Sequence, residues 1–234
     1  MNKDSTQLEN VLGYAFTDKT ILTKALTHTS YAYEHGVCYS NERLELLGDA
    51  VLQLALTEFL MTIYKDEDEG QLSELRAYCV AESCLYRCAA HLGIGDFLLL
   101  GNGEISSGGV NKRSLLADTF EAIIAAIHLD GGYKEAKAFI LRNLTDILMK
   151  VHDTGEHIDH KSRLQHITQK RYGILPTYRV LEERGPSHDK VFTIECSVRT
   201  PVGLLKAQSI GKNKKVAEKA AATKLIDLLP GKKA

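Results

Sequence analysis

Three acidic side chains recur at helical spacing in the segment NERLELLGDAVLQLA, residues 41–55. At about 3.6 residues per turn, Glu42, Glu45 and Asp49 fall within about 60° of arc and share one face of a predicted helix. The other residues of this helix are mostly Leu, Val and Ala. Because like charges in a row repel one another, this face is either fully solvated or collects a cation.

A second acidic pair lies in the apolar segment 114–129, where Asp118 and Glu121 stand one helical turn apart. A helix of this composition is expected to be buried on nearly all sides. Burying an unpaired carboxylate is costly, and the segment contains no Lys or Arg. One solution is an ion pair with a base from elsewhere in the chain, for which the candidates are Arg43, Arg76 and Lys112. The other is a hard divalent cation such as Mg²⁺, held by oxygen ligands from both acidic helices.

The C-terminal part of the chain has the opposite charge. Residues 1–150 contain 13 Lys and Arg against 21 Asp and Glu, whereas residues 151–234 contain 16 against 9. The net charge of -1 therefore conceals an acidic and a basic half. Basic side chains gather around the start of the predicted last helix, at Lys212, Lys214, Lys215 and Lys219. They either form a solvated face or bind phosphate, and the charge asymmetry favours a polyanion. The scarcity of exposed aromatic residues favours duplex recognition over base stacking.

The elements that position these groups change along the chain. Residues 1–150 show apolar spacings of three and four, with turn signals at Asp130, Gly131 and Gly132, which predicts an all-α domain. Residues 151–159 are polar and predict a linker. Residues 160–231 predict an α-β-β-β-α domain, with a helix at 161–171, strands near 177–184, 192–198 and 202–210, and a last helix that buries Ala217 and Leu228.

Composition limits the class of protein. With 234 residues and 44% hydrophobic residues, the chain can bury a sizeable core. No apolar stretch reaches the length of a membrane span and the first ten residues lack the apolar core of a signal peptide, so we expect a cytoplasmic protein without a membrane partner. Five cysteines without close pairs favour reduced thiols. A less favoured alternative is a zinc site formed by Cys79, Cys84, Cys88 and His91.

Several motifs resemble those of bacterial ribonuclease III. They are NERLELLGDA at 41–50, GNGEISSGG at 101–109 and SLLADTFEA at 114–122. Two further motifs, GPSHDKVFTIEC at 185–196 and GKNKKVAEKAAA at 211–222, resemble a double-stranded RNA-binding domain. The motifs cover nearly the whole chain in the order and spacing of that family. The resemblance implies an all-α catalytic and dimerisation domain followed by a double-stranded RNA-binding domain.

The resemblance also implies a catalytic site for Mg²⁺, with Mn²⁺ as a substitute and no organic cofactor. Its metal ligands would be Glu45, Asp49, Asp118 and Glu121, of which Asp49 and Glu121 are the least replaceable. Glu42 and Glu69 match further acidic positions that line the catalytic valley. The residue after Glu45 is usually an aromatic that inserts into the partner subunit of a homodimer. Here it is Leu46, so a softer dimer contact is expected.

In the RNA-binding part, the resemblance implies that Gln165 and His188 contact a minor groove and that the lysines of the last helix clamp phosphate. Two positions depart from the family pattern. His160 stands where a proline is common, and His166 stands where an acid is common. These departures concern the details of RNA contact.

The expected reaction is metal-assisted hydrolysis of both strands of double-stranded RNA, with no side-chain nucleophile and no histidine base. The resemblance implies 5′-phosphate and 3′-hydroxyl ends, short 3′ overhangs, and ribosomal RNA precursors and other structured RNAs as substrates. A non-catalytic double-stranded RNA-binding regulator is the main alternative, and it predicts the loss of a metal carboxylate. A helical phosphohydrolase acting on small nucleotides would leave the basic half without a role.

Overall fold

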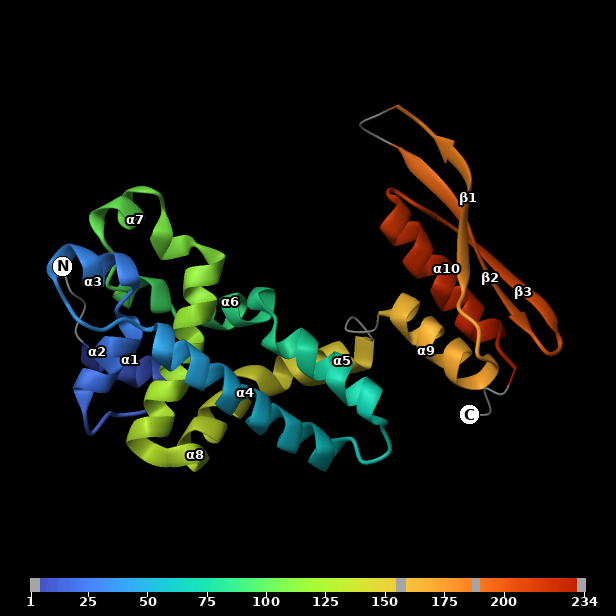
Figure 1. Cartoon of the computed structure of the whole chain (residues 1–234). Coiled ribbons are helices and arrows are strands. Elements are labelled where there is room, and N and C mark those ends of the chain that lie inside the picture. Colours follow the sequence, from blue (N-terminus) through green and yellow to red (C-terminus); the bar gives the residue numbers. More distant parts are fainter. Residues whose placement is uncertain (1–4, 155–158, 187–189, 231–234) are drawn as a thin grey trace. The chain divides into compact units, whose positions relative to one another are not determined.

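The computed structural model describes residues 5–154, 159–186 and 190–230, and Figure 1 shows their helices and strands. The chain divides into two compact units, residues 1–157 and 158–234. The first unit is helical, and the second contains a helix, three strands and a helix. The expected fold class is therefore confirmed.

The first unit is built from eight α-helices within the described residues. They are α1 (Ser5–Leu12), α2 (Lys19–Leu26), α3 (Thr29–His35), α4 (Glu42–Ile63), α5 (Glu69–Val80), α6 (Glu82–His91), α7 (Asn102–Ser106) and α8 (Arg113–Thr154). Two short 3-10 helices, η1 (Ile94–Phe97) and η2 (Gly109–Asn111), lie between α6 and α8.

A glycine divides α8 where the turn signals predicted an interruption. Gly132 has φ 82° and ψ 176°, a conformation that favours glycine. The ring centroids of Phe120 and Phe139 are only 5.5 Å apart, so the chain folds back on itself at this point. The Asp130 carboxylate accepts hydrogen bonds from the backbone N–H groups of Thr17 and Asp18, both at 2.9 Å. These bonds tie the turn to the residues before α2.

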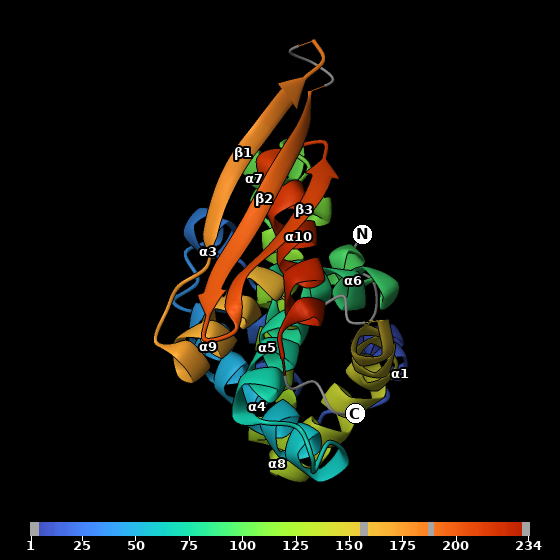
Figure 2. The ribbon, with the colours of Figure 1, turned by 90° about the vertical axis from the view of Figure 1, so that its right-hand side faces the viewer.

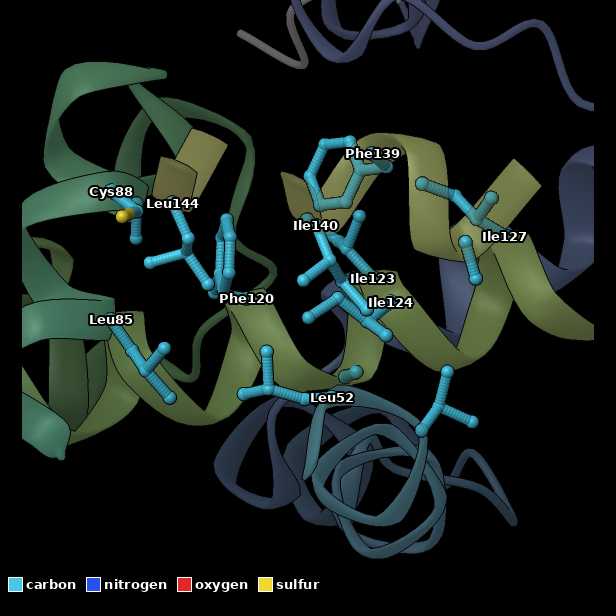
Figure 3. Close-up of a cluster of buried hydrophobic side chains, with 14 of the residues drawn as sticks. Leu52, Leu85, Cys88, Phe120, Ile123, Ile124, Ile127, Phe139, Ile140 and Leu144 are labelled. Carbon is cyan, nitrogen blue, oxygen red and sulfur yellow. The ribbon is translucent and has the colours of Figure 1, made fainter. Parts of the chain in front are cut away.

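The core of the first unit lies between α4 and the two halves of α8. Figure 3 shows Leu52 of α4 facing Ile123 and Ile124 of the first half, with Phe139 and Ile140 of the second half beyond them. All five side chains are at most 1% exposed. The predicted burial of segment 114–129 is thus correct over Ala122–Ile127, where every side chain is fully buried.

Helix α4 is long and apolar enough to cross a membrane by length and composition alone. Its apolar face instead belongs to the core, because Val51, Leu52, Ala55 and Leu56 are buried against the rest of the unit. We therefore describe α4 as the central helix of a packed domain.

The second unit is a three-stranded antiparallel sheet covered by two helices. Its elements are α9 (His160–Tyr172), β1 (Thr177–Arg184), β2 (Val191–Thr200), β3 (Gly203–Gly211) and α10 (Lys214–Leu228), with strand order β1-β2-β3. In β2 the predicted alternation is present, since Ile194, Cys196 and Val198 are buried. Cys196 and Val198 pack with Leu164 of α9 and Leu225 of α10. Figure 2 shows α10 lying along the sheet.

One predicted boundary and one predicted buried residue are wrong. Helix α8 continues to Thr154 because Val151 is buried in the core, so the linker predicted for 151–159 begins too early; residues 155–158 lie outside the described part. Helix α9 then starts at His160, where the Asp159 carboxylate accepts a hydrogen bond from the Lys161 backbone N–H at 3.1 Å. Leu228 is 53% exposed, because α10 ends there and Leu229 turns into the core instead.

The contact between α4 and α8 depends on Gly48. A Cβ atom at this position would lie 1.8 Å from the backbone oxygen of Glu121, so the helices could not keep their present separation. We expect Gly48→Ala to lower the free energy of unfolding by about 3 kcal/mol or more, measured by chemical denaturation. Gly103→Ala in α7 is the control, because nothing lies within 4 Å of its Cβ position. Equal stability of both variants would contradict this account of the contact.

Candidate active site

Two helices bring three of the predicted acidic residues together. Single carboxylate oxygens of Glu45, Asp118 and Glu121 all lie within 4.8 Å of one another. Glu45 comes from the first turn of α4, and the other two come from the start of α8. We call these three residues the acidic cluster. The close approach of α4 to α8 at Gly48 places the cluster where both helices meet.

The environment of the cluster disfavours negative charge. Burial, together with the charges of Asp49, Glu45 and Asp118, raises the pKa of Glu121 to about 8. Burial and the neighbouring carboxylates also raise the pKa of Glu45. The pKa of Asp118 is raised by burial and by Glu82, against a smaller opposite effect of His28.

Basic side chains do not neutralise the cluster. Within residues 5–154 as described, no Lys or Arg forms an ion pair with Asp118 or Glu121. The Arg76 guanidinium donates to the Thr57 hydroxyl at 2.9 Å, and Lys112 pairs with Glu104 at 3.4 Å. The predicted alternative of an ion pair is therefore not observed. Closely spaced carboxylate oxygens without a basic partner are the donor set that a hard divalent cation requires.

Asp49 lies beside the cluster but is held away from it. Both of its carboxylate oxygens accept hydrogen bonds from the Gln53 side-chain amide, at 2.9 and 2.8 Å. The negative charge of Asp49 still acts on the cluster, because it raises the pKa values of Glu45 and Glu121. Gln53 is thus a neighbour of the site that the motif alone does not reveal. Its signal is the spacing of four residues that places it one turn beyond Asp49.

The two further acidic residues, Glu42 and Glu69, lie in different parts of the unit. Glu42 accepts a hydrogen bond from the Ser40 hydroxyl at 3.1 Å, and its charge contributes to the raised pKa of Glu45. Glu69 begins α5 and accepts a hydrogen bond from the Ser73 hydroxyl at 3.0 Å. It lines a hollow between α4 and α5 and is not a member of the acidic cluster.

His28 contributes to the site although it is distant from the carboxylate motifs in the sequence. Its Nδ1 atom accepts a hydrogen bond from the Ser30 backbone N–H at 3.2 Å and caps α3. The ring also offsets a small part of the rise in the pKa of Asp118. No local pattern could have indicated this, because α3 reaches the site only through tertiary packing.

The predicted phosphate-binding lysines lie around the start of α10. Lys212 precedes the helix and the other three lie in its first turns. All four side chains are exposed: Lys212, Lys214, Lys215 and Lys219. The Asn213 side chain caps the helix by accepting from the Val216 backbone N–H at 2.9 Å. Gly211 permits this close turn, since a Cβ there would lie 2.6 Å from the Ala217 nitrogen.

The remaining predicted RNA-contact residues belong to α9 and to the loop between β1 and β2. Gln165 and His166 are exposed on α9, and His188 lies outside the described residues. His160 is half-buried, and burial together with the charge of Lys219 lowers its pKa.

The cysteines do not form a zinc site among the described residues. Cys79, Cys84 and Cys88 are buried whereas His91 is exposed, and these residues are not among the clusters that could hold an ion. Burial raises the pKa of Cys79 to about 12, which is typical of an inert core thiol.

Comparisons with known proteins agree with both units. Residues 18–148 match the family described as Ribonuclease-III-like, and residues 160–229 match the double-stranded RNA binding motif. The chain is 40% identical over 225 residues to Ribonuclease 3 of Fusobacterium nucleatum, covering 95% of this chain and 94% of that protein. It is 43% identical over 230 residues to Ribonuclease 3 of Syntrophobacter fumaroxidans, covering 95% and 93%.

A solved structure extends the similarity to the nuclease fold. The nuclease domain of ribonuclease III from Campylobacter jejuni is 44% identical and has a TM-score of 0.58, covering 61% of this chain and 97% of that one. In that nuclease domain, a region involved in dimer formation is structurally flexible. The chain therefore belongs to the ribonuclease III family, as an endoribonuclease whose helical nuclease domain precedes a double-stranded RNA-binding domain.

Proposed function

We propose that this endoribonuclease hydrolyses both strands of double-stranded RNA with the help of Mg²⁺, for which Mn²⁺ substitutes. Glu45, Asp118 and Glu121 would hold the ion, joined by Asp49 when it leaves Gln53. The observation that carries this proposal is the acidic cluster, in which one oxygen from each carboxylate lies within 4.8 Å of the others. Among the described residues, no Lys or Arg forms an ion pair with Asp118 or Glu121, which leaves the oxygens for a cation. When bound, the ion would polarise the phosphodiester and activate water for its hydrolysis.

The protein groups of the site have a supporting role in this chemistry. The carboxylates of the cluster provide negative oxygens on two rigid helices, so their positions are set before RNA arrives. Gln53 keeps Asp49 hydrogen-bonded and close. His28 lies on the side of Asp118, where its ring favours the charged carboxylate. A side-chain nucleophile is not required.

The remaining parts of the proposal rest on family membership. The products would be 5′-phosphate and 3′-hydroxyl ends with short 3′ overhangs. The substrates would be ribosomal RNA precursors and other structured RNAs in the cytoplasm. The basic start of α10 supports a duplex substrate, because exposed lysines beside helix amides bind phosphate without reading base sequence.

A second copy of the chain is the proposed partner of the exposed face of α4. Leu46, Leu54 and Met61 lie on one side of this helix and are 75%, 51% and 63% exposed. Beside them is a largely apolar hollow of about 400 Å³, lined by Thr57, Leu60, Met61, Glu69, Leu72, Ser73 and Arg76. A symmetric dimer through this face would cover both features and bring two acidic clusters into one assembly, one for each strand.

Substitution of one metal ligand tests the proposed reaction. We expect Glu121→Gln to lower cleavage of a long RNA duplex in Mg²⁺ at least about 100-fold while duplex binding is retained. Glu135→Gln is the control, because Glu135 is an exposed carboxylate on the same helix. Product length and end chemistry with Mg²⁺ or EDTA provide the readout. Unchanged turnover of Glu121→Gln would exclude its role as a ligand, and wild-type binding without cleavage would favour a regulator.

The raised pKa of Glu121 predicts how the stability of the metal-free protein depends on pH. The folded state keeps the proton until about pH 8, whereas the ordinary carboxyl pKa is 4.5. The stabilisation is therefore complete below pH 4.5 and is lost as the pH rises through 8. In EDTA, Glu121 should make the free energy of unfolding fall on the order of 1–3 kcal/mol over this range. Subtracting the profile of Glu121→Gln isolates this effect, and identical profiles would contradict it.

The phosphate-binding role of α10 is tested by its salt dependence. Replacing Lys214 and Lys215 by Ala should weaken duplex binding about tenfold, independently of RNA sequence. The slope of log affinity against log salt concentration should fall by about 2. Lys206→Ala is the control, because Lys206 pairs with Glu195 on the sheet at 3.0 Å. A slope equal to that of the wild type would show that the phosphate contacts lie elsewhere.

A further inference from the structure

A second hollow on the nuclease unit is lined by cationic and aromatic side chains. It has a volume of about 320 Å³, and its lining residues are Tyr78, Ser83, Tyr86, Arg87 and Arg113. We call it the arginine hollow. Its residues come from the end of α5, from α6 and from the first residue of α8. None of them is used in the proposed reaction or belongs to the acidic cluster.

Both arginines are oriented by tyrosines and remain without a carboxylate. The Arg113 guanidinium lies over the Tyr86 ring, 5.5 Å from its centroid. Arg87 donates to the Tyr78 hydroxyl at 3.5 Å. Within the described part of the unit, neither arginine forms an ion pair, and both are exposed. A guanidinium that stacks on an aromatic face keeps the N–H groups at its edge available for an anion.

The start of α6 adds neutral donors to the same hollow. Ser83 lies in the first turn of α6, and Ala81, the residue before this helix, forms no side-chain cap. The first amide groups of a helix have no partner within the helix, and the helix dipole favours an anion there. Ser83 and Arg87 are four residues apart, so they lie on one face of α6. A hydroxyl, helix amides and two guanidinium groups together form the donor set of a phosphate site.

We propose that the arginine hollow is a binding site for a nucleotide phosphate, with Arg87 and Arg113 holding the phosphate and Tyr86 contacting the attached nucleoside. An adjoining hollow of about 330 Å³ shares Tyr86 and is lined further by Asp96 and Asn111. Tyr86 therefore stands between a cationic space suited to phosphate and a polar space that can accept a base. The nucleotide phosphate could come from a free nucleotide or from a strand of the RNA substrate, because both carry a phosphate joined to a nucleoside.

Arg113 lies on the same helix as Asp118 of the acidic cluster, which favours the RNA strand as the source of the phosphate. It precedes Asp118 by five residues on α8, which corresponds to about 7.5 Å along the helix axis. Helix α6 packs against α8, and the charge of Glu82, the neighbour of Ser83, acts on Asp118. A strand cut at the cluster could therefore place a neighbouring phosphate in the arginine hollow. This source, unlike a free nucleotide, rests on the proposed function.

Ligand titrations of the full-length protein test the site without depending on cleavage. The probes are adenosine 5′-monophosphate, inorganic phosphate and adenosine, measured by calorimetry. If free nucleotides use the site, the monophosphate should bind most tightly, and Arg87→Gln or Arg113→Gln should each weaken it about tenfold. Tyr86→Leu should weaken the monophosphate but leave inorganic phosphate unchanged. Lys134→Gln, an exposed residue of α8 outside the hollow, should change neither.

Duplex cleavage by the same variants distinguishes the two sources. If the RNA strand uses the site, Arg87→Gln and Arg113→Gln should raise KM for the duplex about tenfold with kcat retained, whether or not free nucleotides bind. Nucleotide binding that the arginine variants abolish, with KM unchanged, would assign the site to free nucleotides. Unchanged nucleotide affinity and unchanged KM in both variants would overturn the proposal. Failure of the wild type to cleave would instead count against the proposed function alone.

Discussion

The close approach of α4 to α8 at Gly48 determines the geometry of the nuclease unit. Because no side chain separates the two backbones there, Glu45 of one helix comes within reach of Asp118 and Glu121 of the other. The same contact aligns Leu52 with the buried isoleucines of α8 in a single core. Both the core packing and the acidic cluster therefore depend on the distance between α4 and α8, and a change in that distance would alter both.

Gathering carboxylates at this contact opposes folding. Burial and the charges of nearby carboxylates raise the pKa values of all three residues of the acidic cluster, so the metal-free site is strained electrostatically. Burial of the apolar residues Ala122–Ile127, directly after Glu121, offsets this unfavourable electrostatic energy. Such a local conflict within an otherwise consistent domain is typical of a functional site. A bound cation would relieve it by neutralising the repulsion.

The two units divide the electrostatic tasks that an RNA-cleaving enzyme must combine. The acidic unit would hold cations but repels an RNA backbone, whereas the basic unit presents exposed lysines at the start of α10. Separating the charges avoids internal neutralisation of the acidic cluster by lysines. The arginine hollow is an exception within the acidic unit, because tyrosines rather than carboxylates orient its two guanidinium groups. Neither of these arginines pairs with the acidic cluster.

Local spacing alone determined much of this protein, because apolar periodicity and turn residues depend on neighbours in the chain. It predicted the helical unit, the break at Gly132, the α-β-β-β-α unit and the two acidic helices. Tertiary structure decided the rest. Val151 extends α8 by packing into the core, and His28, which precedes α3, acts electrostatically on Asp118 of α8. The arginine hollow also joins residues of three helices. Such contacts depend on packing between segments far apart in the sequence, which local patterns do not encode.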